Sequence, residues 1–152
     1  MFNSSARILL TLIVSVSFTV TASAKGDMTS QQATTVNIKL GNAQNRLQFF
    51  PAQLHFETGK LYKLVIHNPS AQKHYFTAPE MSRAVFTRKV QLVSQVGNTL
   101  AEVKGRIDEI EVYPGQTAEW WFVPVKTLTT SRLHCSIKGH SAAGMTGYIT
   151  IK

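Results

Sequence analysis

Cysteine and acidic residues are scarce in this chain of 152 residues. Cys135 is the only cysteine, and eight Asp and Glu stand against 16 Lys and Arg. The basic residues form no run or helical stripe, so nucleic acid is not an expected partner. The main apolar stretch, residues 8–20, is shorter than the roughly 20 residues that cross a bilayer. These absences argue against a disulfide framework, a nucleic-acid-binding protein and a membrane span in the mature chain.

The N-terminal residues have the features of a secretory signal peptide. A single basic residue, Arg7, precedes the apolar stretch, which is followed by the A-x-A cleavage pattern of Ala22, Ser23 and Ala24. We expect a signal peptide over residues 1–24 and a periplasmic or otherwise exported protein, with an uncleaved membrane anchor as the alternative. Cleavage removes one basic residue and no acidic one, so the formal net charge falls from +8 to +7. That charge predicts an acidic partner.

The remaining residues predict one all-β domain. Residues 25–34 are small and polar and suggest a flexible N-terminal arm, and residues 35–152 have the length of one compact domain. Apolar residues alternate as in strands in residues 36–40 and 61–67, and residues 116–123 are rich in aromatic side chains. Turn signals separate these segments at residues 41–42, 57–60, 68–70, 96–98 and 113–116. This spacing predicts a β-sandwich or small barrel with Greek-key connections.

Two local features add detail to the predicted domain. Residues 81–91 contain no Gly or Pro and tolerate a helical period, so we expect a short helix there. Trp120 and Trp121 are adjacent in a predicted strand. Side chains alternate along a strand, so one indole should be buried and the other should face outward.

The C-terminal part of the chain contains the motif with chemical meaning. An exported protein is expected to pair its cysteines, so the lone Cys135 needs another explanation. Cys135, His140 and Met145 follow one another as Cys-x4-His-x4-Met on what reads as one loop between strands. A thiolate, an imidazole and a thioether favour copper over hard cations, and two His, one Cys and a weak axial Met are the blue-copper set. Zinc also binds two His and a Cys, but it would gain little from the Met.

A second imidazole must then come from a distant strand. His74 is the best candidate, because it follows a loop and opens an extended stretch at a strand edge. His67 ends an apolar strand, where we expect a backbone partner, and it is kept as the alternative ligand ahead of His55. His134 directly precedes Cys135 and should therefore point away from the metal.

The predicted ligands of one copper ion are thus His74, Cys135, His140 and Met145. Further positions make the chain similar to the plastocyanin/azurin family of cupredoxins. These are Phe50, Pro51, Leu54, Gly59, Leu64, Asn68, Pro114, Gly115, Glu119, Trp120, Phe122 and Gly147. The loop from Cys135 to Met145 most resembles that of rusticyanin-type cupredoxins. The resemblance covers most of residues 35–152, and it implies a Greek-key cupredoxin β-sandwich, one type 1 copper and electron transfer between redox proteins.

The sequence departs from the family pattern at two positions. Many members have Asn directly after the first ligand histidine, where it ties the two ligand segments together. This chain has Tyr75 there, so the tie must be made differently. Family loops also commonly carry Pro between the Cys and the His, where this chain has Lys138, which adds an N–H and a positive charge.

These observations predict an exported electron carrier, a monomer that is not an enzyme and whose partner is an acidic redox protein such as a cytochrome. A periplasmic copper carrier or copper-homeostasis protein is the alternative, although the chain has no His-rich tract and only four methionines. Multicopper oxidases and copper nitrite reductases need further histidines, typically directly after the Cys, where this chain has Ser136, or in His-x-His motifs, which it lacks. We also expect the outer edge of His140 to reach the surface among small residues, beside Lys138.

Overall fold

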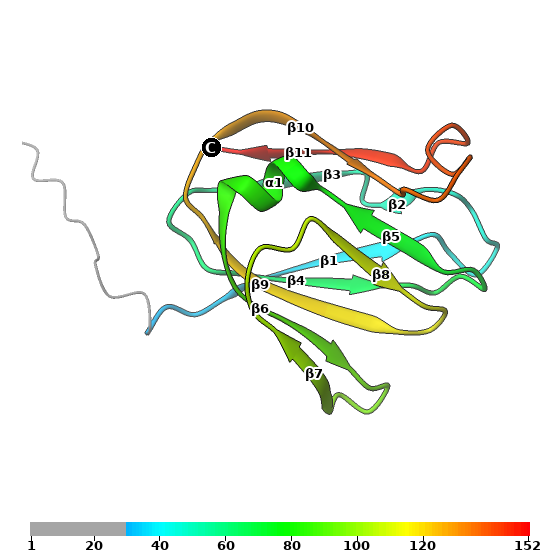
Figure 1. Cartoon of the computed structure of the whole chain (residues 1–152), viewed down its shortest axis with the longest axis horizontal. Helices are drawn as coiled ribbons and strands as arrows, with labels where there is room; N and C mark the ends of the chain where they lie inside the picture. The colour runs from blue at the N-terminus through cyan, green and yellow to red at the C-terminus, as the bar shows by residue number, and fades with distance from the viewer. Residues whose placement is uncertain (1–29) are drawn as a thin grey trace, which may run out of the picture.

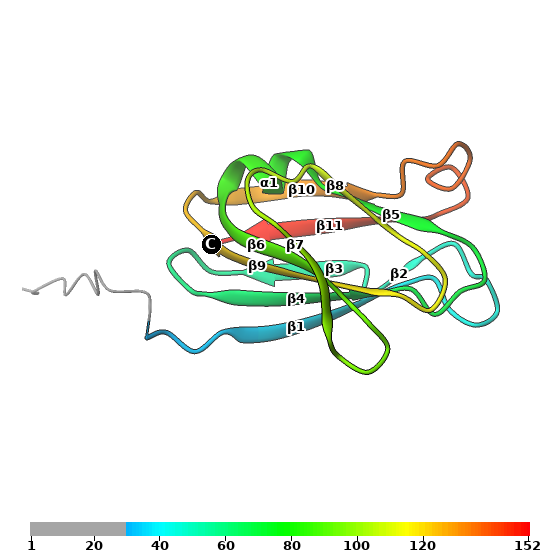
Figure 2. The same cartoon turned by 60° about the horizontal axis from the view of Figure 1, so that its bottom comes forward.

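A computed structural model of the chain describes residues 30–152, which form two β-sheets packed face to face (Figures 1 and 2). The predicted signal peptide and the first half of the predicted arm, residues 25–29, lie outside these residues. Of the arm, Gln31 is described, and its side-chain amide donates to the Gly59 carbonyl at 3.3 Å. A helix long and apolar enough to span a bilayer is not found between residues 30 and 152.

The first sheet contains six strands in the order β2-β1-β4-β9-β6-β7. They are β1 (Thr34–Leu40), β2 (Phe49–Phe50), β4 (Tyr62–His67), β6 (Val85–Val93), β7 (Thr99–Val103) and β9 (Thr117–Pro124). β1 and β4 pair in parallel, whereas the other neighbours pair antiparallel. Burial alternates along β4, with Tyr62, Leu64 and Ile66 inside. This alternation confirms the predicted strand and its inward face.

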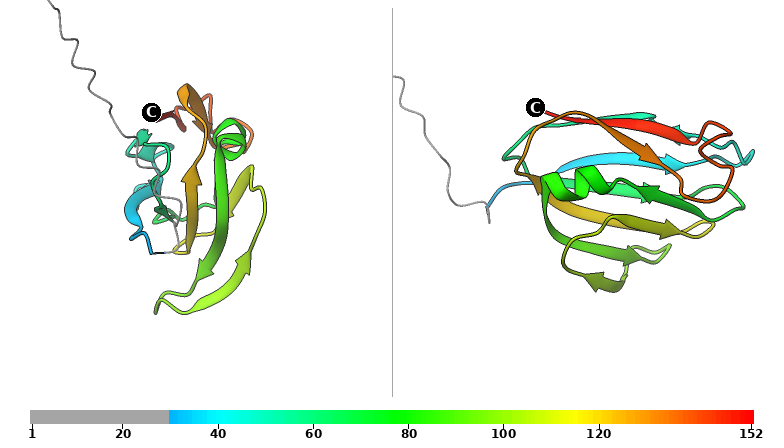
Figure 3. Two further views of the ribbon diagram at one scale, coloured as in Figure 1. Left: turned by 90° about the vertical axis from the view of Figure 1, so that its left-hand side faces the viewer. Right: turned by 45° about the horizontal axis from the view of Figure 1, so that its top comes forward.

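The second sheet contains five strands in the order β3-β11-β10-β5-β8. They are β3 (Gln53–Phe56), β5 (His74–Thr77), β8 (Glu109–Val112), β10 (Leu128–His134) and β11 (Thr146–Ile151). The chain passes from one sheet to the other several times, for example between β4 and β5 and between β9 and β10, so strands distant in sequence become neighbours (Figure 3). The predicted all-β sandwich is confirmed.

An aromatic core fills the space between the sheets. The buried Trp120 ring meets Phe76 edge-on at 6.2 Å and Phe122 at 5.3 Å between centroids, and Phe122 in turn meets Phe56 at 5.1 Å. The indole N–H of Trp120 donates to the Thr87 hydroxyl at 3.1 Å, so its burial leaves no polar atom unsatisfied. Because Phe76 belongs to β5, this packing anchors the strand that begins with His74.

The predicted turns and the alternation of the tryptophans are confirmed. All five segments with turn signals lie between strands. Trp120 is 1% exposed, whereas Trp121 is only partly buried and its ring lies 5.5 Å from the Lys63 ammonium and 5.3 Å from that of Lys89. The two indoles thus face opposite sides of β9.

The predicted helix over residues 81–91 is wrong for most of its length. Helix α1 spans Pro79–Ala84 and is followed directly by β6. Pro79 suits the first turn of a helix, where no N–H donor is needed. From Val85 onward, β-branched and aromatic residues favour a strand, and pairing with β9 fixes them in the sheet. The sequence is compatible with a helical period in this segment, but pairing with β9 makes it a strand.

Four loops gather at one end of the sandwich, on the right in Figure 1. They comprise residues 41–48, 68–73, 113–116 and 135–145. Hydrogen bonds join the first three, from the Ala71 N–H to the Asn45 side chain at 2.8 Å and from the Asn68 N–H to the Gln116 carbonyl at 3.1 Å. We call this end, defined by the four loops, the loop end.

Candidate metal centre

His74 is the first residue of β5 and is completely buried at the loop end. The loop before it is fixed by the buried Asn68, whose side-chain amide donates to the carbonyls of Gln72 at 2.7 Å and Val112 at 2.8 Å. The Ser70 hydroxyl donates back to the Asn68 side-chain oxygen at 2.7 Å. Val112 also lies opposite His74 in the β5–β8 register. The extended stretch predicted from His74 onward is confirmed as β5. Its first residue, His74, is positioned by the Asn68 contacts of the preceding loop and by its pairing with Val112.

The loop between β10 and β11 brings Cys135 and His140 to the same place. Cys135 donates its N–H to the Met145 carbonyl at 3.2 Å, and Met145 donates its own to the His140 carbonyl at 2.9 Å. The Ser141 hydroxyl donates to the Cys135 carbonyl at 2.9 Å. These hydrogen bonds join the two ends of the loop, so residues 135–145 form a compact turn.

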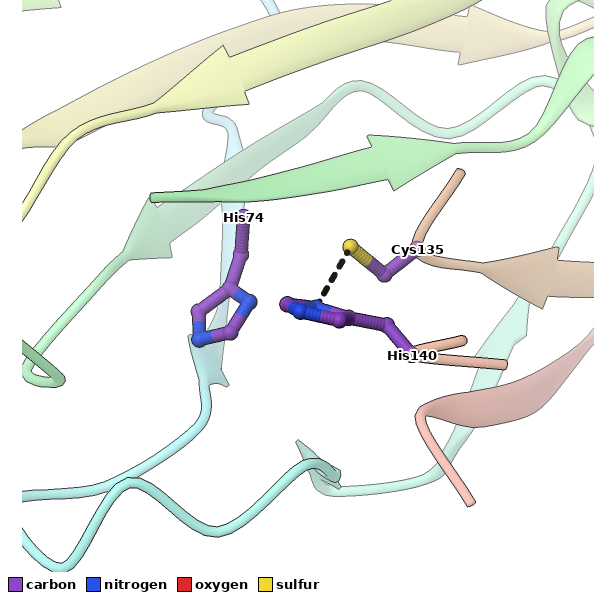
Figure 4. Close-up of side chains that lie close together, drawn as sticks. All are labelled: His74, Cys135 and His140. Atoms are coloured by element: carbon purple, nitrogen blue, oxygen red, sulfur yellow. Dashed lines mark hydrogen bonds between the residues drawn. The ribbon is translucent and has the colours of Figure 1, made fainter. Parts of the chain in front are cut away.

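The side chains of His74, Cys135 and His140 converge, as Figure 4 shows. One ligand atom from each lies within 4.8 Å of the others. His140 Nδ1 is 3.5 Å from Cys135 Sγ, and the two imidazole centroids are 5.2 Å apart. This group could bind one copper ion, since a thiolate with two imidazoles suits copper.

His74 shows the best fit between the protein and a metal. Neither of its ring nitrogens has a hydrogen-bond partner among residues 30–152, although the residue is fully buried. Buried polar atoms are normally paired, so two unpaired nitrogens on one buried ring beside a thiol fit the role of a metal ligand. Burial, and then the nearby His140, lower the pKa of His74. The imidazole is therefore neutral, which is the form that binds metals.

Gly41 allows the close approach of the neighbouring loop to His74. Its φ of +74° lies in the left-handed region, and a Cβ there would stand 3.2 Å from His74 Nε2 and 3.1 Å from the Arg46 carbonyl. The sequence predicted a turn at Gly41 but not this packing. In the sequence, the only sign of this close approach is that a glycine stands in a turn signal, because the contact joins segments 33 residues apart.

A backbone hydrogen bond joins the two segments that carry the site. The Tyr75 N–H donates to Cys135 Sγ at 3.3 Å. The Tyr75 ring is partly buried against the core. This N–H to sulfur contact is a backbone tie between the two segments, and it does not depend on which side chain stands at position 75.

The remaining histidines lie apart from the group. His67 Nδ1 is 3.0 Å from the Thr117 hydroxyl, so its partner is a side chain and not the predicted backbone group. The correction follows from the register, in which His67 and Thr117 are directly opposite. His55 Nδ1 lies 2.6 Å from the Thr150 hydroxyl, and His134 is outside the group, as its place beside Cys135 predicted.

Met145 and His140 differ in exposure. Met145 is completely buried at the end of the same loop, bonded through its backbone to both loop ligands. His140 is partly exposed, with the small exposed residues Ala142 and Ala143 following it. The predicted access to solvent at His140 is thus present, whereas the ligand role of Met145 stays a prediction.

Solved structures of copper proteins share this fold. Auracyanin A, a blue copper protein from the green thermophilic photosynthetic bacterium Chloroflexus aurantiacus, is 16% identical over 80% of this chain and 100% of its own, with a TM-score of 0.50. A multicopper oxidase from Campylobacter jejuni, a metallo-oxidase, is 16% identical over 84% of this chain, with a TM-score of 0.54. Copper nitrite reductase from Nitrosomonas europaea is 12% identical over 66% of this chain, with a TM-score of 0.50.

The chain has the cupredoxin fold, as the resemblance implied. It spans about a third of the oxidase and of the reductase, matching 32% of each. No family model matches the sequence, and no curated protein is similar to it in sequence. At these identities the likeness concerns the fold, which occurs both in a small blue copper protein and in parts of larger enzymes.

Proposed function

We propose that the protein is an exported type 1 copper protein that carries single electrons between redox partners. The observation that supports this most is the convergence of His74, Cys135 and His140, with the nitrogens of the fully buried His74 left without a partner among the described residues. Met145, buried on the same loop, is the proposed weak axial ligand. A bound copper ion would supply one-electron chemistry by changing between Cu(II) and Cu(I).

The chain's contribution is a site whose residues are held in place by its own hydrogen bonds. Asn68 holds the segment before His74, and the loop hydrogen bonds hold Cys135 against Met145. Residues fixed in this way need to move little when the charge at the site changes, which favours fast electron exchange. An all-side-chain ligand set also leaves no obvious place for a substrate, which supports a carrier over an enzyme.

Other features support a carrier rather than an oxidase or a reductase. Ser136 follows Cys135, where such enzymes typically have a ligand histidine for a second copper centre. Within residues 30–152, His74, Cys135 and His140 are the one group of this kind. His55 and His67 are each engaged with a threonine hydroxyl.

The loop end has the charge expected of a surface that meets an acidic redox protein. Its four loops contain no Asp or Glu, and they carry Arg46, Lys138 and Lys73, the last of which pairs with Glu111 of β8. His140 is partly exposed among them. Such a surface steers an anionic partner toward the histidine edge and leaves small side chains to be desolvated there. Export rests on the predicted signal peptide over residues 1–24.

Anaerobic copper titration of the mature protein tests the proposal. We expect one equivalent of copper to bind, an intense thiolate-to-copper absorption band to develop, and reversible one-electron cycling in a redox titration. Release of copper on reduction would favour the copper-carrier alternative. Binding without the band would show that Cys135 does not reach the metal, and the proposal would be wrong.

A further inference from the structure

The His74 end of β5 is paired as a strand on one side only. On the β8 side, His74 lies opposite Val112 and Tyr75 lies opposite Glu111. On the β10 side, the single register pair in the described part of the chain joins Thr77 to His134, at the far end of β5. At Tyr75 the contact on that side is the N–H donated to Cys135 Sγ at 3.3 Å. The position of this N–H therefore depends on how firmly β5 is held to β8.

Side chains reinforce β5 and β8 at this end. Lys73 and Tyr75 are the two sequence neighbours of His74. Lys73 pairs with Glu111 on β8, and Tyr75 lies directly opposite it in the register of the two strands. The Lys73 ammonium is 2.8 Å from a Glu111 carboxylate oxygen, and it lies 6.0 Å from the Tyr75 ring and 5.9 Å from the Tyr113 ring. We call Lys73, Tyr75, Glu111 and Tyr113 the β5–β8 clamp.

The clamp differs from an ordinary surface ion pair in the number of its contacts. Isolated exposed pairs contribute little, because water screens them and both side chains must be ordered. Here the Glu111 side chain is only 27% exposed, and its ion-pair partner Lys73 also lies over the rings of Tyr75 and Tyr113. Hydrogen bonds from Lys73 and Tyr75 lower the pKa of Glu111, so the carboxylate is charged at neutral pH. β8 is an edge strand, so no further strand supports it from outside.

We propose that Glu111 is a positioning residue for the Cys135 sulfur: through the clamp it holds β5 in register with β8, so that the Tyr75 N–H stays directed at Sγ. Hydrogen bonds to a ligand sulfur remove electron density from it and tune the metal that it binds. The inference rests on the proposed function for that last consequence. The clamp itself belongs to the metal-free protein and can be tested there.

Hydrogen exchange of the Tyr75 amide, measured by NMR in the metal-free protein, is the direct test. Glu111→Ala should accelerate this exchange about tenfold or more, because the amide opens locally. The Leu64 amide in β4 serves as the internal reference for global unfolding and should change much less. Glu57→Ala is the matched control, since it breaks a 2.8 Å ion pair with Lys60 outside the loop end. It should leave the Tyr75 amide unchanged.

Two further variants keep the test decisive. Glu111→Gln keeps the length of the side chain and an oxygen acceptor for Lys73, and it should restore much of the protection. Lys73→Gln removes the other partner and covers the case in which Glu111→Ala fails to fold. In the copper-loaded protein, Glu111→Ala should shift the reduction potential and the charge-transfer band, while Glu57→Ala should not.

The outcomes separate this inference from the proposed function. Unchanged exchange of the Tyr75 amide in both Glu111→Ala and Lys73→Gln would overturn the positioning role, even if the wild-type protein binds copper and cycles. A wild-type protein that develops no charge-transfer band would instead overturn the proposed function. The exchange data on the metal-free protein would still decide whether the clamp holds Tyr75.

Discussion

The loop of residues 68–73 has a histidine at each end, and the two surroundings differ. His67 ends β4 on the outward face of its sheet, partly exposed, with its Nδ1 3.0 Å from the Thr117 hydroxyl. His74 begins β5, is completely buried, and neither of its ring nitrogens has a hydrogen-bond partner within residues 30–152. A position at a strand end is thus not what distinguishes a candidate ligand. The difference is that the loop leads from the outward face of the first sheet to a buried position at the start of β5 in the second sheet.

The largest effect should come from removing the Cys135 thiol, which lies near His74 and not near His67. Cys135→Ser should abolish the charge-transfer band completely, because the thiolate is the only ligand here that can produce it. The absorption spectrum after copper addition is the measurement. A serine variant that keeps the colour would remove the reason for treating the two histidines differently.

Substitution of the histidines themselves tests the comparison directly. His74→Ala should weaken copper binding by more than the roughly 10–100-fold that losing an outer-shell partner costs, and should reshape the band. His67→Ala should leave affinity and spectrum nearly unchanged, because its ring is engaged by Thr117 on the outward face. Competition titration with a chelator measures both affinities.

The reverse result would move the ligand assignment to His67. In that case β4 and not β5 would supply the first imidazole. The burial and the unpaired nitrogens of His74 would then need another explanation.

Gly41 offers a smaller change that touches His74 without replacing it. Gly41→Ala places a Cβ at positive φ, which costs about 1–2 kcal/mol, and also against His74 Nε2 at 3.2 Å, which adds about 1–3 kcal/mol. Gly59→Ala is the matched control, since its φ is +75° and its Cβ would meet nothing within 4 Å. Thermal or urea unfolding measures the difference.

The copper spectrum of the two alanine variants separates strain from contact. Gly41→Ala should alter the band, and Gly59→Ala should leave it as in the wild type. Equal destabilisation with unchanged spectra would mean that the loop of residues 41–48 moves to accommodate the added methyl group and does not displace His74.

Sequence patterns predicted the elements of the site better than its supports. The alternation in β4, the extended stretch from His74 and the Cys-x4-His-x4-Met loop are local patterns, and each lies where it was expected. The helix was wrong beyond Ala84, because β-branched residues there pair with β9 and a local period does not report such pairing.

The missed features depend on neighbours in space that no local pattern reveals. Tyr75 lies opposite Glu111 because β5 and β8 are adjacent, although 36 residues separate them. The choice of Thr117 as the partner of His67 arises in the same way, whereas the contact of Gly41 with His74 joins the loop after β1 to a strand of the other sheet. The departure at Tyr75 indicated only that the Asn side-chain tie is missing, and the backbone contact from the Tyr75 N–H to Cys135 Sγ could not be predicted from it.

Met145 should have a weaker influence than His74, since an axial thioether contact is long. Met145→Gln should retain copper and lower the reduction potential, because a harder oxygen donor favours Cu(II). Redox titration of the two proteins measures the shift. Complete loss of copper from the Gln variant would place Met145 among the principal ligands. The contrast between His74, which is needed for copper binding, and Met145, which adjusts the potential, would then be weaker.

The smallest effects should come from charge at the loop end. His140 is partly exposed there, and Lys138 is exposed beside it, whereas Lys152 is exposed at the C-terminus, at the opposite end of the sandwich in Figure 1. Lys138→Ala should reduce the rate of oxidation of the copper-loaded protein by ferricyanide about twofold to threefold at low salt, because one steering charge is lost. Lys152→Ala is the control and should have a smaller effect.

Salt and the sign of the probe decide whether the loop end is the route. The Debye length is about 30 Å at 0.01 M salt and about 8 Å at 0.15 M, so the Lys138→Ala effect should fade as salt is raised. Ala143→Glu should slow ferricyanide more, by repulsion at the surface beside His140, and should favour a cationic cobalt complex. Neither substitution should alter the copper spectrum. If both variants react at wild-type rates across the salt range, electrons do not leave at His140. The partly exposed Trp121 is then the next route to test, although two lysine ammonium groups flank its ring and disfavour any positive charge on it.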